Sequence, residues 1–168
     1  MAKNPTPFST RHPLEAGPRK AISAMLNQSL SDLSDLYSQV KQAHWNVKGE
    51  NFIALHKLFD EVAASLQEPI DTIAERIVTL GGVAEGTLRQ TAERTDVAEM
   101  SREFDHNEVL GELADRFAAI SRSGYALIKK VDEAGDPVTA DIYTEITRSI
   151  DKSLYFLETH LQRRTSAE

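Results

Sequence analysis

The chain has 168 residues, of which 40% are hydrophobic, enough for one domain with a sizeable core. It contains no cysteine, which excludes disulfide frameworks, thiolate metal sites and cysteine nucleophiles. The net charge of −7 excludes a wholly basic nucleic-acid-binding surface. No apolar run is long enough to cross a membrane and no secretory-type stretch opens the chain, so a cytoplasmic location is expected.

Residues 1–20 differ in composition from the rest of the chain. They hold four of the six prolines and carry a charge of +3, whereas the remainder carries −10. Their basic side chains are Lys3, Arg11, Arg19 and Lys20. We expect a mobile basic tail at 1–20, followed by one helical domain at 21–168. An ordinary disordered terminus would have the same composition.

Apolar residues recur at steps of three and four in four long segments, which predicts four helices. The expected helices cover about 18–48, 51–80, 106–134 and 136–161. Gly81 and Gly82 end the second helix as a left-handed cap. The polar connection at about 83–105 has room for a short helix. This order predicts an all-α four-helix bundle with one long crossover.

The second helix carries two different buried faces when its residues are placed 100° apart on a wheel. One face is apolar throughout and predicts the bundle core. A second sector, about 100° wide, holds His56, Asp60, Asp71 and Glu75 among small and apolar residues. This mixture predicts a second packing seam, whereas the sector that includes Arg76 is expected to face solvent.

The spacing of these polar residues is typical of metal ligands. His56/Asp60 and Asp71/Glu75 are pairs four residues apart, so both members can reach one ion. Imidazole with carboxylates suits iron, manganese or zinc. The pairs are separated by about 22 Å of helix, so one ion cannot reach both in one chain. Either there are two weak sites, or a two-fold dimer with this helix antiparallel joins one copy's Asp71 and Glu75 to the other's His56 and Asp60.

His44 favours the shared site. It lies on the apolar stripe of the first helix and is as far from residue 50 as His56 is, so an antiparallel hairpin brings the two histidines together. The complete site would then hold two imidazoles and three carboxylates. Taken singly, such a histidine is more often a hydrogen-bonded core residue, and acidic pairs are more often solvated.

Two segments, KQAHWNVKGENFIALHKLFDEV at 41–62 and DTIAERIVTLGGVAEGT at 71–87, resemble the Dps family of ferritin-like proteins that protect bacterial DNA. The resemblance continues more loosely through ELADRF at 112–117 and TADIYTEITRSIDKSLYFLE at 139–158. It implies a ferritin-like bundle and a bacterial, cytoplasmic protein that can associate with the nucleoid.

The resemblance also implies a homo-dodecameric hollow shell. Such shells oxidise ferrous iron, preferentially with hydrogen peroxide, at a di-iron ferroxidase centre between two-fold-related chains, and they store the ferric mineral inside. The matching ligands are His44, His56, Asp60, Asp71 and Glu75. DNA binding by such a shell would be sequence-independent, because nothing in the chain reads base edges. Family members that bind DNA often use a basic N-terminal tail, which makes Lys3, Arg11, Arg19 and Lys20 the candidate contacts to DNA phosphates. Twelve such weak tails could act together by avidity.

Several other positions match the family. Trp45 matches a tryptophan beside the centre, although by itself it would be core filler. Asp115 matches a carboxylate near the three-fold pores, although it could equally be a solvated charge. Arg76 and Asp151 could form an ion pair. Pro69 is a departure from the pattern, and we expect it to interrupt and kink the second helix.

Three other interpretations stay open. A true ferritin would place its site inside each bundle with Glu-x-x-His on two helices, but this chain has one such spacing, Glu103 to His106. A non-catalytic shell could compact DNA with zinc in place of iron. A helical interaction module would have no metal role at all.

Overall fold

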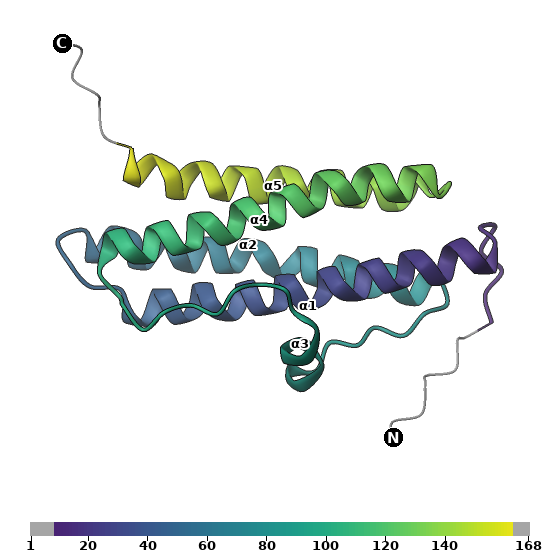
Figure 1. The fold of residues 1–168 in the computed structure, drawn as a ribbon, viewed down its shortest axis with the longest axis horizontal. Coiled ribbons are helices and arrows are strands. Elements are labelled where there is room, and N and C mark those ends of the chain that lie inside the picture. The colour runs from purple at the N-terminus through teal and green to yellow at the C-terminus, as the bar shows by residue number, and fades with distance from the viewer. Residues whose placement is uncertain (1–8, 163–168) are drawn as a thin grey trace, which may run out of the picture.

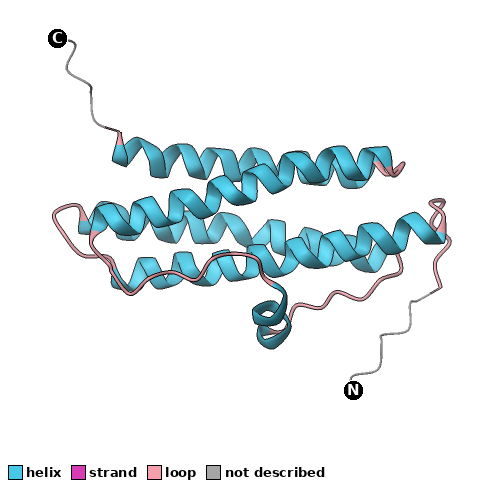
Figure 2. Cartoon of the chain, in the orientation of Figure 1, coloured by secondary structure: helices cyan, strands magenta, loops and turns pink. Residues whose placement is uncertain are grey.

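The computed structural model describes residues 9–162 and contains five helices. They are α1 (Ala16–Asn46), α2 (Phe52–Thr79), α3 (Leu88–Arg94), α4 (His106–Glu133) and α5 (Pro137–Leu161). The four long helices form the bundle, and the short α3 lies in the crossover between α2 and α4 (Figure 1, Figure 2). The predicted all-α bundle is confirmed. Within the described range, no helix is both long and apolar enough to span a membrane.

The bundle consists of two helical hairpins. α1 packs along α2 and α4 packs along α5, and the two hairpins meet through contacts of α1 with α4 and of α2 with α5 (Figure 1). Phe59 of α2 and Phe117 of α4 are among the large side chains that are fully buried between them. The expected core face of α2 is buried except at its margins, where Phe52 is exposed and Ile70 is half-buried. α2 continues unbroken through Pro69, so the expected interruption of this helix is wrong.

The crossover follows α1 because polar side chains of α1 bind its backbone. Asn27 Nδ2 donates to the Val83 carbonyl at 3.0 Å, and Asn27 Oδ1 accepts from the Glu85 amide at 2.9 Å. Further along, Asp32 Oδ1 accepts from the Asp96 amide at 2.9 Å. Burial raises the pKa of Asp32, although the hydrogen bond from Asp96 acts in the opposite direction. These contacts hold the connection across one side of the bundle.

The helical domain starts earlier than the composition indicated. α1 begins at Ala16, and Arg19 lies in its first turns. Arg19 donates from Nε to the Leu14 carbonyl and from Nη1 to the Leu80 carbonyl, both at 2.9 Å. Arg19 is therefore fixed to the bundle and is not carried on a tail. Lys20 also belongs to α1 and is exposed.

Arg76 is buried, so its expected place on the solvent-facing side of α2 is wrong. Its Nη2 donates to both carboxylate oxygens of Asp136, at 2.8 and 3.0 Å, and its Nε donates to Thr139 Oγ1 at 2.9 Å. The end of α2 is thereby tied to the start of α5. The suggested partner Asp151 instead accepts a hydrogen bond from Tyr125 at 3.0 Å.

Candidate metal centre

His44 and His56 lie side by side at the loop end of the α1–α2 hairpin, as the spacing predicts. Their rings stack with centroids 3.8 Å apart and planes inclined by 23°. Each histidine binds the backbone of the other: His44 Nδ1 lies 2.7 Å from the His56 carbonyl, and His56 Nδ1 lies 2.8 Å from the His44 carbonyl. Both side chains are half-buried. The reciprocal bonds fix the two rings before any ligand arrives.

These bonds also assign the protons on the rings. A carbonyl only accepts, so each Nδ1 must carry the hydrogen, and in the neutral imidazole the lone pair then lies on Nε2. Metal-binding histidines characteristically donate their second nitrogen to a carbonyl or carboxylate in this way. Both histidines are therefore in the tautomer that a metal ligand needs.

Asp60 lies one turn after His56 on α2 and is paired with a lysine that the spacing argument did not include. Lys41 Nζ lies 2.6 Å from Asp60 Oδ1. The hydrogen bond from Lys41 lowers the pKa of Asp60, and the positive charge of Lys41 acts in the same direction. Asp60 is therefore held in its charged form. Lys41 precedes His44 by three residues on the same helix, which is the signal that could have identified it.

Asp71 and Glu75 are exposed on α2, and Asp71 lies about three turns beyond Asp60. They do not reach the histidines of their own chain. Among residues 9–162, no three His, Asp or Glu side chains come close enough together to hold a metal ion. The described chain therefore presents the five expected ligands as two separate groups on one face of the hairpin.

The face that carries both groups is unusually apolar for an exposed surface. Trp45 is 65% exposed, Ile53 60% and Val78 54%, and Leu88 of α3 is almost fully exposed. An open hollow, which Trp45, Leu88 and Asp71 help to line, runs between α1 and α2 on this side. Exposed apolar side chains gathered in this way are typical of a protein–protein interface. This face includes the sector of α2 in which the helical wheel predicts a second packing seam.

The remaining expected residues are all apart from the histidine pair. Asp115 is exposed on α4, next to the buried Arg116, which holds the crossover through the Ala98 and Glu99 carbonyls at 2.9 and 2.7 Å. Of the expected DNA-contacting residues, Arg11 is exposed ahead of α1. Lys3 lies outside the described residues.

Comparison with known proteins extends these observations. A ferritin-like domain model matches residues 23–166. The DNA protection during starvation protein of Agrobacterium fabrum is 40% identical over 160 residues, covering 93% of this chain and 97% of that protein. DpsC from Streptomyces coelicolor superposes with a TM-score of 0.91 at 29% identity, over 100% of this chain and 99% of that one. Dps from Staphylococcus aureus gives a TM-score of 0.82 at 30% identity, over 86% and 97%.

The four long helices and the crossover with its short helix define a ferritin-like bundle. The chain differs from a bundle with an internal metal site, because its candidate ligands lie on an outer face of the α1–α2 hairpin. Together with the similarity over nearly the whole chain, this identifies the family. The chain belongs to the Dps family of ferritin-like proteins.

Proposed function

We propose that this protein oxidises ferrous iron with hydrogen peroxide at a site shared by two copies of the chain. The ferric product is stored inside a hollow dodecamer, and DNA is protected because iron and peroxide are both removed. The observation that carries the proposal is the preformed histidine pair, with Asp60 one turn away and Asp71 and Glu75 on the same exposed face.

A two-fold axis near Leu66 would complete the site. With α2 antiparallel to its copy, the Asp71 and Glu75 of a second chain come to His44, His56 and Asp60 of the first. The same operation makes a second, identical site, because a two-fold interface is self-complementary. The exposed Trp45, Ile53 and Val78 would be covered in this dimer, which accounts for their apolar character.

The donor set suits iron that changes oxidation state. Carboxylates are hard, anionic ligands that favour the ferric ion, whereas the imidazoles also bind the ferrous ion well. Two ferrous ions at one site each give one electron to a hydrogen peroxide molecule. The oxygen–oxygen bond breaks, and two protons complete two water molecules. A paired two-electron step avoids the hydroxyl radical that a single ferrous ion would release.

Lys41 has a defined part in this scheme. Its ammonium group occupies the side of Asp60 where a second cation would otherwise bind, 2.6 Å from the carboxylate. It therefore keeps Asp60 ionised and oriented until iron enters. Binding of a second ferrous ion at Asp60 would have to displace this contact, so we expect the two iron positions to differ in affinity.

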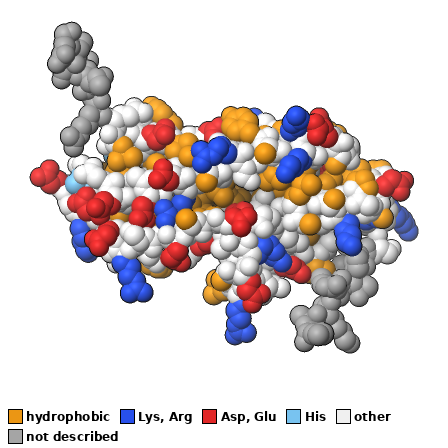
Figure 3. Space-filling model, in the orientation of Figure 1, with side chains coloured by type: hydrophobic (Ala, Val, Ile, Leu, Met, Phe, Trp, Pro, Cys, Tyr) orange, Lys and Arg blue, Asp and Glu red, His pale blue; other side chains and the backbone are white. Residues whose placement is uncertain are grey.

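The distribution of basic side chains favours chemical over physical protection of DNA. Arg19 is anchored in the bundle, which leaves Arg11 and Lys20 as the exposed basic residues near the described start of the chain. On the face drawn in Figure 3, Lys and Arg side chains are scattered among acidic ones. We propose that any DNA binding is sequence-independent and falls steeply with added salt.

The experiment that tests the shared site is stopped-flow absorbance of iron oxidation. Metal-stripped protein is mixed with ferrous iron and then with peroxide, and Asp71→Ala/Glu75→Ala is compared with wild type. The matched control is Glu61→Ala/Glu68→Ala, which removes two exposed carboxylates from the same helix. We expect rapid oxidation in wild type and control and loss in the first variant. Equal rates in all three would contradict the site, and no ferric absorbance in wild type would favour the zinc-occupied shell.

A further inference from the structure

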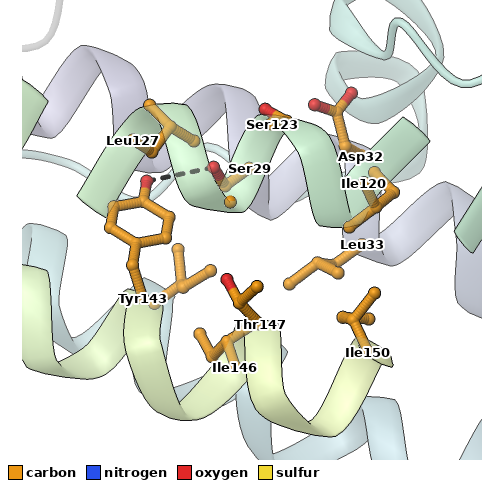
Figure 4. A pocket seen from close by; sticks show the side chains of 12 residues that line it. Ser29, Asp32, Leu33, Ile120, Ser123, Leu127, Tyr143, Ile146, Thr147 and Ile150 are labelled. Carbon is orange, nitrogen blue, oxygen red and sulfur yellow. Dashed lines mark hydrogen bonds between the residues drawn. The ribbon is translucent and has the colours of Figure 1, made fainter. Parts of the chain in front are cut away.

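A small cavity lies in the bundle and is lined by α1, α4 and α5, together with Ile73 of α2 (Figure 4). Most of its lining is aliphatic, including Leu33 of α1 and Ile146 of α5. Hydroxyl groups interrupt this lining: Ser29 faces it from α1, and Tyr143 and Thr147 face it from α5. The cavity is far from the histidine pair and takes no part in the proposed iron chemistry.

The hydroxyl of Thr147 is the unusual group in this cavity. Thr147 is only 4% exposed, and its Oγ1 is buried with no hydrogen-bond partner in the described chain. Two other threonines of α5 bond back to their own helix: Thr144 Oγ1 donates to the Ala140 carbonyl at 2.8 Å and Thr159 Oγ1 to the Tyr155 carbonyl at 2.7 Å. Thr147 instead points from α5 toward α1 and α4 (Figure 4). A hydroxyl left unpaired in apolar surroundings is costly, so it requires a partner.

A second hydroxyl proton in the cavity also has no assigned acceptor. Ser29 Oγ and Tyr143 Oη lie 3.0 Å apart, and either can donate to the other. Each has one proton, so this bond uses one and leaves one. Burial raises the pKa of Tyr143 to about 12, so the phenol stays protonated and neutral. The cavity therefore contains two O–H groups and several oxygen lone pairs without an assigned partner.

We propose that this cavity binds one water molecule, which hydrogen-bonds the Thr147 hydroxyl and the Ser29–Tyr143 pair and so links α5 to α1. The cavity volume of about 20 Å³ suits one water molecule, since about 10–15 Å³ is needed. Buried waters usually have two to four polar partners, which these hydroxyls supply. Exposed Ser123 of α4 lies at the rim and marks a path from solvent.

The test is Thr147→Val, which removes the hydroxyl and keeps the shape of the side chain. If water is bound, the variant loses a link between α5 and α1 and leaves the Ser29–Tyr143 pair without its third partner. We then expect Tm of the assembled protein to fall by about 2–4 °C. If the cavity is dry, the variant removes an unpaired hydroxyl and Tm rises. Thr144→Val on the same helix is the control, because its hydroxyl already has a partner.

High-resolution crystals provide the second readout. We expect density for one water within hydrogen-bond distance of Thr147 Oγ1 in wild type, and none in Thr147→Val. Wild-type crystals without this density overturn the proposal whatever the melting temperatures show. Density in wild type combined with an unchanged or raised Tm of Thr147→Val overturns the linking role.

Discussion

Lys41 donates a hydrogen bond to Asp60 from the neighbouring helix, with 2.6 Å between the ammonium nitrogen and the carboxylate oxygen. A cation is thus already present beside a carboxylate that we assign to iron. This contact joins α1 to α2 on the face where the second copy is expected. It can also be changed without removing a proposed ligand.

Replacing Lys41 with Gln should change both the pKa of Asp60 and the affinity for ferrous iron at this carboxylate. The present contact lowers the pKa of Asp60, so the carboxylate stays ionised to more acidic pH than an isolated Asp. In Lys41→Gln we expect the pKa to rise toward its ordinary value and the second ferrous ion to bind more tightly near neutral pH. Carboxyl NMR titration and ferrous-iron calorimetry measure the two effects.

The exposed Lys57 of α2 supplies the control for this experiment. Lys57→Gln removes the same charge from the same surface without touching Asp60. If both variants shift iron affinity equally, the effect comes from net charge and the specific role of Lys41 is wrong.

Mixed shells test whether two copies share each site. One chain would carry His44→Ala/His56→Ala and the other Asp71→Ala/Glu75→Ala. In a mixed dimer, one site combines both defects, whereas the other receives intact groups from both chains. Each homo-oligomer should therefore be inactive, and co-assembly should restore about half of the initial rate per mixed dimer. A mixture that stays inactive after verified co-assembly would show that the ligands do not combine across the interface.

Arg76→Ala should destabilise the fold and leave the metal ligands in place. The substitution leaves the buried Asp136 carboxylate without its cationic partner. We expect this to lower the free energy of unfolding by about 3–5 kcal/mol and Tm by roughly 10 °C. Arg89→Ala, on the exposed side of α3, is the control and should change Tm little. Calorimetric melting measures both, and a Tm of Arg76→Ala within 2 °C or so of wild type would mean that the pair contributes little.

The same pair predicts how stability responds to acid. Burial alone would raise the pKa of Asp136, but hydrogen bonds from Thr139 and Arg76 together lower it. The folded state therefore binds this proton less readily than the unfolded state does. The stabilisation is complete above the unfolded pKa and is lost as pH falls through the folded one. As the pH is lowered, the Tm of wild type should therefore drop more steeply than the Tm of Arg76→Ala.

Replacing each of two glycines of α4 with alanine should change the free energy of unfolding in opposite directions. A Cβ at Gly124 would lie 2.2 Å from Thr147 Oγ1, whereas a Cβ at Gly111 would meet nothing within 4 Å. Gly124→Ala should destabilise by about 1–3 kcal/mol through overpacking. Gly111→Ala should stabilise by about 0.5–1 kcal/mol because alanine is the better helix former. Equal shifts in Tm would show that α4 and α5 can separate at no cost.

The sequence predicted those features that repeat locally along the chain. The periodicity predicts a helix at about 106–134, and α4 spans His106–Glu133. Gly81 has the positive φ of 83° expected for a helix cap. The pattern predicts a first helix that begins at about Pro18, but α1 begins at Ala16. A proline in the first turn needs no N–H partner, so the helix can begin before it.

Features that depend on distant partners were missed. The helical wheel placed Arg76 toward solvent, because nothing near it in sequence shows that Asp136 will be buried beside it. The hairpin symmetry correctly paired His44 with His56. It could not show that each histidine ring binds the backbone carbonyl of the other histidine. Every residue has a backbone carbonyl, so residue types do not indicate which carbonyl will accept a hydrogen bond.

The separation of the two ligand groups along α2 has a consequence for where iron chemistry can occur in the cell. On the proposed pairing, a newly made, unpaired chain has only half of each centre and cannot complete the two-electron reaction. Oxidation begins when chains associate, so the reaction is switched on by assembly itself. Ferric product would therefore form where a shell is present to hold it, and free subunits would not deposit insoluble iron elsewhere.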